Sequence, residues 1–315
     1  MHHLVTFTPS DLQSGRAASL ADPEAFRWRM LAQGDSWFTS SAERAHGSLL
    51  PELVFNAPAA AVNCAVGGEA LRHMVDLESA PDFVRLLTGK DAPVWDGILL
   101  SCGGNDLIAA ASTSAQYADG SEVPLHLRLL RRQTEWGAPS AGVARYFSED
   151  GWATYAAYLR ANVKHLLSLR DQGPSAGKPV FMHCYAVPMP RPAGAAESSG
   201  APVLGSYGPW LYPAVKAYAL PQADWAAISR LMVFRLAQAL KSMAADQATY
   251  PGLQVFDSTL VPLALATAGS GGSSGDWHNE IQLNHSGSFK IARAWSDHIR
   301  LVFEPPPVTT GRRSR

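Results

Sequence analysis

Short apolar runs that alternate with helical segments are the feature that most limits how this chain can fold. Each run is rich in apolar or small residues and ends near glycine or a polar residue, which is typical of a strand buried on both faces. Buried strands separated by helices indicate a mostly parallel sheet with helices on both sides. The five strands predicted in this way are 27–32, 59–66, 94–101, 179–187 and 253–257.

Apolar residues at helical spacing predict the helices between and after these strands. The segment 69–87 is expected to form two short helices that are broken near Pro81. The longer amphipathic helices are expected at 152–169, 224–245 and 288–302.

Two segments, about 111–150 and 188–222, show no clean period, and the second is rich in proline. Both are too long for simple connections, so we expect insertions that act as lids or binding loops. Residues 1–25 are expected to form a surface arm, and the tail after Glu304 is expected to be frayed.

A length of 315 residues is sufficient for one large α/β domain, and we predict a single domain over 1–315. The predicted architecture is a three-layer α/β/α sandwich around a mostly parallel, five-stranded sheet. The net charge is −1, so no basic excess suggests nucleic acid, and no apolar run approaches the roughly 18 residues of a membrane span. The oligomeric state is not predicted.

The N-terminus lacks a basic segment followed by an apolar stretch, so we expect no signal peptide and a cytoplasmic protein. Three cysteines, at 64, 102 and 184, argue against a disulfide framework and for buried, reduced side chains. The chain has no zinc-ligand spacing and no dinucleotide fingerprint, so neither a metal nor a cofactor is expected.

Polar or glycine-rich clusters follow each of the first three predicted strands. They contain Ser36 in Gly-Asp-Ser-Trp-Phe, Gly68 in a Gly-Gly pair, and Asn105 in Gly-Gly-Asn-Asp. Because ligands bind outside the carboxyl ends of parallel strands, we expect these residues to meet at one rim of the sheet. Ser36 is therefore a candidate nucleophile, whereas an isolated Asp-Ser pair after a strand is often only a helix cap.

In this order the three clusters resemble the motif blocks of the SGNH/GDSL hydrolase family, and the resemblance extends over about residues 28–303. It implies a flavodoxin-like α/β/α fold and cleavage of a carboxylic ester without a cofactor. It also implies that Ser36 is the nucleophile and that Gly68 and Asn105, with the Ser36 N–H, stabilise the oxyanion. Glycine at position 68 allows a positive φ and a close approach of the backbone.

The last block departs from the family pattern, which is Asp-x-x-His-Pro-Asn followed two residues later by glycine. Asn284 and Gly287 set the register, so the histidine slot holds Gln282 and the aspartate slot holds Asn279. Glutamine cannot take a proton near neutral pH, and loss of the base in a serine triad costs about 10⁴- to 10⁶-fold in turnover. We therefore predict a crippled or inactive hydrolase.

Three explanations of the glutamine remain open. Gln282 could be an introduced substitution in an otherwise active esterase, or the chain could be a natural relative that binds an ester or acyl ligand without cleaving it. In the third explanation another histidine substitutes, either His278 oriented by Asp276 or His285. Acyl transfer to an acceptor other than water would use the same nucleophile.

The small-molecule ester or acyl substrate is expected to meet four further residues. His183 follows the fourth strand on the same rim and is either a substrate contact or a satisfied structural histidine. Trp37, Trp210 and Trp277 flank motif or insertion segments and are either parts of an apolar acyl pocket or core residues.

Overall fold

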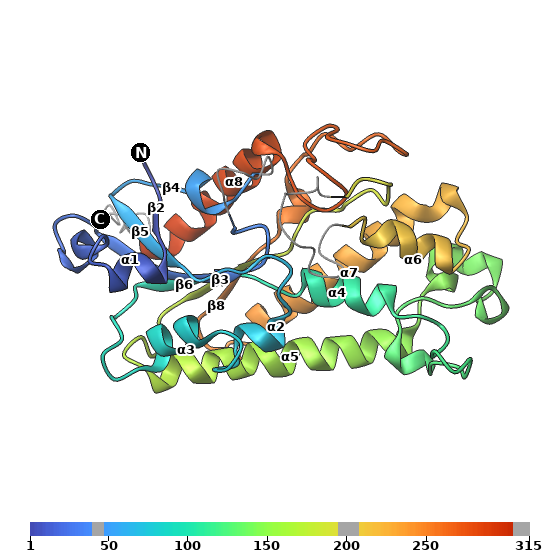
Figure 1. Cartoon of the computed structure of the whole chain (residues 1–315), viewed down its shortest axis with the longest axis horizontal. Helices are drawn as coiled ribbons and strands as arrows, with labels where there is room; N and C mark the ends of the chain where they lie inside the picture. The colour runs from blue at the N-terminus through green and yellow to red at the C-terminus, as the bar shows by residue number, and fades with distance from the viewer. Residues whose placement is uncertain (40–46, 195–207, 305–315) are drawn as a thin grey trace, which may run out of the picture.

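A computed structural model describes residues 1–39, 47–194 and 208–304 of the chain (Figure 1). Its main sheet has six strands in this part of the chain, and every neighbouring pair is parallel. The predicted α/β class and the mostly parallel sheet are thus confirmed. In spatial order the strands are β2 (Val5–Phe7), β5 (Ala59–Asn63), β3 (Trp28–Gly34), β6 (Gly97–Ser101), β7 (Val180–His183) and β8 (Leu253–Phe256).

The prediction of five strands was wrong by one, because β2 lies in the segment expected to be a surface arm. Val5 pairs with Ala60 and Phe7 with Val62, which makes β2 an edge strand of the sheet. Val5 is exposed and Phe7 is only partly covered, so these three residues lack the continuous apolar pattern that identified the central strands. Nearby, β1 (His2–His3) pairs with β4 (Val54–Phe55) in a separate antiparallel ribbon.

Helices cover both sides of the main sheet. In Figure 1, α8 lies above the sheet, and α2, α3 and α5 lie below it. The helix α1 is the short segment Pro9–Gln13. The other α-helices are α2 (Leu71–Met74), α3 (Pro81–Thr88), α4 (Gly104–Ser112), α5 (Glu149–Gln172), α6 (Leu211–Ala217), α7 (Trp225–Ala245) and α8 (His285–Phe303).

Local sequence sets where these helices begin. Pro81 is the first residue of α3, which confirms the predicted break in the segment 69–87. The side chain of Asn284 accepts a hydrogen bond from the Gly287 N–H at 3.0 Å and caps the start of α8. The residues that set the register of the last motif block therefore also form a helix cap.

The first insertion is ordered although it has no helical period. It contains three 3₁₀ segments, Leu125–Leu127, Gln133–Glu135 and Pro139–Tyr146. The buried guanidinium of Arg128 donates to the Glu135 carboxylate at 2.6 and 2.9 Å and so ties the segment together. The second insertion contains α6, and its residues 195–207, like the tail 305–315, lie outside the described residues.

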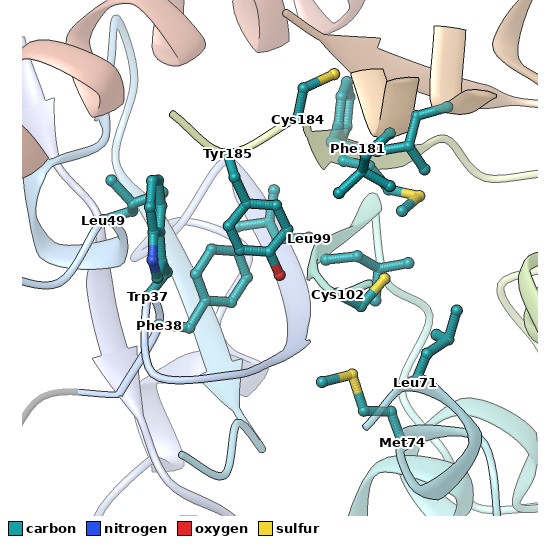
Figure 2. Packing of buried hydrophobic residues seen from close by; sticks show 14 of the residues in the cluster. Trp37, Phe38, Leu49, Leu71, Met74, Leu99, Cys102, Phe181, Cys184 and Tyr185 are labelled. Carbon is teal, nitrogen blue, oxygen red and sulfur yellow. The ribbon is translucent and has the colours of Figure 1, made fainter. Parts of the chain in front are cut away.

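The core is continuous on both faces of the sheet. Cys102 and Cys184 are free and buried within it, whereas Cys64 is half-buried. Figure 2 shows Tyr185 between Trp37 and the side of the core that contains Cys102. In the described ranges, no helix is long and apolar enough to cross a bilayer.

Candidate active site

Ser36 lies in a tight turn directly after β3. A Cβ atom on Gly34 would come within 2.8 Å of the Cβ and carbonyl oxygen of Ser101, so only glycine fits at the end of this strand. The Asp35 N–H then donates to the Ser101 carbonyl at 3.1 Å, and the chain turns. Ser36 is 7% exposed and lines a pocket at the rim of the sheet.

The Asp35 carboxyl group is buried beneath this turn. It accepts hydrogen bonds from the Tyr185 hydroxyl at 2.5 Å, the Ser101 hydroxyl at 2.8 Å and the Trp37 N–H at 3.0 Å. Burial raises the pKa of Asp35 to about 6, although these hydrogen bonds act in the opposite direction. Asp35 therefore fixes the turn that carries Ser36, although burial destabilises its charged form.

Substituting Asp35 by asparagine is expected to remove a pH dependence of stability. Between pH 3.8, the ordinary pKa of an aspartate, and about pH 6, the folded chain binds more protons than the unfolded chain. Its free energy of unfolding therefore falls, relative to that of the variant, as the pH rises through this range. A difference of about 2 in pKa corresponds to about 3 kcal/mol. Urea unfolding at pH 4, 5, 6 and 7 measures the difference between the two chains, and a constant difference would contradict the titration of Asp35.

Asn105 lies in the first turn of α4, which follows the neighbouring strand β6. Gly103, at φ +92°, precedes α4, and the Asn105 side chain donates from Nδ2 to the Glu69 carbonyl at 3.0 Å. The other amide hydrogen of Asn105 has no partner among the described residues and is available to a ligand. Asn105 lines the same pocket as Ser36, as the order of the motif blocks predicted.

Gly68 lies in the turn that Asn105 holds. Its φ is +83°, which glycine adopts without strain. The Asp106 carboxylate accepts from the Leu71 N–H at 3.0 Å and thus joins this turn to α4 a second time. Gly68 itself is exposed and is not among the residues that line the pocket.

The pocket is predominantly apolar, with a few polar groups near Ser36. This combination is typical of a small-molecule site. The lining residues are Asp35, Ser36, Trp37, Gly104, Asn105, Leu107, Ile108, Tyr185, Ala186, Pro188, Leu211, Ser229, Met232, Val233, Leu236 and Ile281.

Of the three predicted tryptophans, only Trp37 lines this pocket. Trp277 is 1% exposed and belongs to the core, so its packing alternative holds. Trp210 is half-buried at the start of α6, and it is the adjacent Leu211 that reaches the pocket. The pocket alternative therefore does not hold for Trp277 and Trp210, because the fold supplies the apolar wall from α4, α6 and α7.

His183 is fully buried in an aromatic cluster and does not line the pocket. Its ring stacks on Trp37 with centroids 5.3 Å apart and meets Trp295 edge to face. Its Nδ1 accepts from the Tyr185 N–H at 3.3 Å, and burial lowers its pKa to about 3. These contacts agree with a structural role for His183, but the histidine is only partly satisfied, because its buried Nε2 has no partner among the described residues.

Two buried amides, Asn279 and Gln282, occupy the positions expected to hold the acid and the base. Asn279 Nδ2 donates to Gln282 Oε1 at 2.5 Å, and Asn279 Oδ1 accepts the Gln282 N–H at 2.8 Å. Ile281, between them, lines the pocket, and its carbonyl accepts from Trp37 Nε1 at 3.2 Å. The loop that carries Asn279 and Gln282 therefore lies against the turn of Ser36 and Trp37, and neither amide can accept a proton near neutral pH.

Asp276 has partners that leave it unsuited to orient His278. It accepts from Lys290 Nζ at 2.7 Å, the Ser286 hydroxyl at 2.8 Å and the Ala264 N–H at 2.6 Å. Burial alone would raise the pKa of Asp276, but the hydrogen bonds outweigh it and lower the pKa. Asp276 thus anchors the loop to the first turns of α8.

The two candidate substitute histidines also lie away from the pocket lining. His285 is exposed, and its Nδ1 lies 3.2 Å from Glu52 Oε1. His278 is half-buried, its N–H donates to the Gln282 carbonyl at 2.9 Å, and burial lowers its pKa. The geometry gives no support to either histidine as a replacement base.

Two residues of the site were missed from the sequence. Tyr185 has a φ of +61° and holds Asp35, and nothing in the pattern of the fourth strand indicates such a conformation. Glu280 is a fully buried acid within the last motif block. The sequence around Glu280 does not indicate that this residue is buried, because its hydrogen-bond partners are about 70–90 residues away in the chain.

Comparisons with solved structures returned proteins that carry names of the kind the sequence resemblance predicted. One carries the name SGNH hydrolase, from Slackia heliotrinireducens, at 16% identity and a TM-score of 0.42, over 86% of this chain and 98% of that chain. An arylesterase by name, from Agrobacterium tumefaciens, has 16% identity and a TM-score of 0.41 over 87% and 98%. A possible lipase from Chitinophaga pinensis has 11% identity and a TM-score of 0.44 over 87% and 98%.

No protein-family model and no curated protein matches the chain. At the TM-scores found, the solved structures add no argument about the site, so its chemistry rests on the residues of this chain.

Proposed function

We propose that the chain is a serine hydrolase of the esterase or lipase type in which Gln282 occupies the position of the proton-accepting histidine. The observation that carries this proposal is that Ser36 and Asn105, from the ends of adjacent strands β3 and β6, line one pocket. The loop that holds Gln282 lies against Trp37, the residue after Ser36.

In the proposed reaction the Ser36 hydroxyl attacks the carbonyl carbon of a carboxylic ester. Negative charge then develops on the carbonyl oxygen, and the free amide hydrogen of Asn105 with the N–H group of Ser36 would stabilise it. One such donor contributes about 3–4 kcal/mol to lowering the barrier. The hydrogen bond from Asn105 to the Glu69 carbonyl fixes the amide in advance, so little reorganisation is needed.

Proton transfer is the step that this chain performs poorly. An active form would carry histidine at 282 and an acid at 279, whereas the neutral amide of Asn279 donates a hydrogen bond to that of Gln282. A serine with its oxyanion donors but without its base retains only residual catalysis, about 10³- to 10⁴-fold over water. Acyl transfer to a different acceptor would use the same groups.

The second candidate function is a binding protein for an ester or acyl ligand. The specific observation in its favour is the Asn279–Gln282 pair, which is buried and joined by two hydrogen bonds between neutral amide groups. In this alternative the pocket holds its ligand and Ser36 does not react.

Hydrolysis of short p-nitrophenyl esters by the chain as it stands and by Asn279→Asp/Gln282→His separates the two. Turnover by this double variant that exceeds the residual rate supports the hydrolase. If neither form turns over any ester, the hydrolase proposal is contradicted and the binding protein remains.

A further inference from the structure

Tyr185 follows β7 and has a backbone conformation that tyrosine rarely adopts. Its φ is +61°, in the left-handed region where a Cβ atom is strained. The Tyr185 N–H donates to Nδ1 of the buried His183 at 3.3 Å, which helps to hold this conformation. Strain of this kind persists only where the surrounding contacts fix it, and the contacts of the side chain show what the conformation achieves.

The hydroxyl end of Tyr185 holds the turn of Ser36. It donates to Asp35 Oδ2 at 2.5 Å, and Asp35 Oδ1 accepts from the Trp37 N–H at 3.0 Å. Burial raises the pKa of Tyr185 well above its ordinary value of 10.0, so the hydroxyl stays protonated and remains a donor. The indole of Trp37 meets the Tyr185 ring edge to face, with centroids 5.0 Å apart (Figure 2). Both sequence neighbours of Ser36 therefore contact Tyr185.

The ring of Tyr185 packs on the start of α4, directly before Asn105. A Cβ atom on Gly104 would lie 2.7 Å from Tyr185 Cζ and 2.9 Å from Cε1, so only glycine allows the ring this close to the helix. The φ of Gly104 is not positive, so the backbone conformation itself does not require glycine. The ring of Tyr185 thus explains the second glycine of the Gly-Gly-Asn-Asp motif.

We propose that Tyr185 is a positioning residue that sets the separation between the Ser36 hydroxyl and the Asn105 amide. Its hydroxyl holds one turn and its ring supports the other, and all three residues line the same pocket. A shift of about 1 Å in a catalytic group can cost about 10²-fold in rate, so this separation matters for attack on an ester. The inference rests on the proposed function and adds to it a residue that does not itself react.

Tyr185→Phe in the Asn279→Asp/Gln282→His background is expected to lower kcat for p-nitrophenyl acetate by about 10- to 100-fold and to change KM by less than about 3-fold. The ring still supports α4, whereas Asp35 loses the donor that holds the turn of Ser36. Tyr146→Phe is the matched control, because the buried Tyr146 hydroxyl also donates to a carboxylate, that of Asp224 at 2.6 Å, outside the pocket lining. An unchanged kcat in Tyr185→Phe, or an equal loss in Tyr146→Phe, would overturn the proposal.

Gly104→Ala in the same background tests whether the ring connects the two turns. The added methyl group would meet the ring at 2.7 Å and must displace it, so we expect kcat to fall by about 10-fold or more. Tyr185→Ala removes the ring and makes room for the methyl group. Adding Gly104→Ala to Tyr185→Ala should therefore change kcat by less than about 3-fold, and a full additive loss would contradict a connection through the ring.

Hydrogen exchange in the chain without the substitutions at 279 and 282 keeps this inference separate from the proposed function. In Tyr185→Phe we expect the peptide that contains Ser36 and Trp37 to exchange about 10-fold faster, whereas Tyr146→Phe leaves its exchange unchanged. Unchanged exchange in Tyr185→Phe would overturn the positioning role even if esters are hydrolysed. Faster exchange, with no ester turnover by Asn279→Asp/Gln282→His, would overturn the hydrolase and leave Tyr185 as the residue that holds the turn.

Discussion

The double variant Asn279→Asp/Gln282→His is expected to hydrolyse p-nitrophenyl esters about 10⁴-fold faster than the chain as it stands, or more. Removing the base from a serine triad costs about 10⁴- to 10⁶-fold, and the substitution reverses such a loss. The two positions already contact each other, with Asn279 Nδ2 and Gln282 Oε1 2.5 Å apart. Initial rates under identical conditions measure the gain.

The two single variants are the controls for this experiment. Gln282→His alone is expected to gain less than the double variant, because an asparagine in the acid slot favours the wrong tautomer of the imidazole and costs up to about 10⁴-fold. Asn279→Asp alone is expected to gain nothing, since position 282 still cannot accept a proton. A double variant no faster than the unaltered chain would show that the slots were wrongly assigned.

Removing the Ser36 hydroxyl in the double variant is expected to abolish the whole gain, a loss of about 10⁴-fold or more in kcat. Without the hydroxyl no acyl-enzyme can form, and only the oxyanion donors and the binding pocket remain. Ser36→Ala should leave the fold intact, because the turn is held by Asp35 and Ser101. Steady-state rates and a thermal melt of the same sample measure both effects.

Ser168→Ala is the matched serine-to-alanine control. Ser168 is exposed on α5, and its hydroxyl donates to the His165 carbonyl, so its loss should leave kcat unchanged. Retention of activity by Ser36→Ala would assign the nucleophile to another residue.

The central strands could be predicted from the sequence because continuous apolar runs are needed where a strand is buried on both faces. The strand β6, for example, is buried along its whole length. The strand β2 could not be predicted in this way, since an edge strand of three residues needs only backbone pairing and little apolar surface.

The positions of Ser36 and Asn105 at the rim of the sheet could also be predicted from the sequence. The residues that form the pocket wall could not. Ser36 and Asn105 each follow a parallel strand, so topology alone brings them together. The pocket wall comes from α4, α6 and α7, and its residues carry the same apolar signal as core residues. Tertiary packing alone decides that Trp277 is core and that Leu211 reaches the pocket.

The most direct test of the central claim is covalent labelling by an alkyl fluorophosphonate, followed by peptide mass spectrometry. The reagent phosphonylates an activated serine, so it reports the nucleophile and its activation together. We expect the adduct on Ser36 in Asn279→Asp/Gln282→His, formed at least 100-fold faster than in the unaltered chain. An adduct on a different residue, or equal labelling rates in the two chains, would contradict the claim that Ser36 is a nucleophile deprived of its base by Gln282.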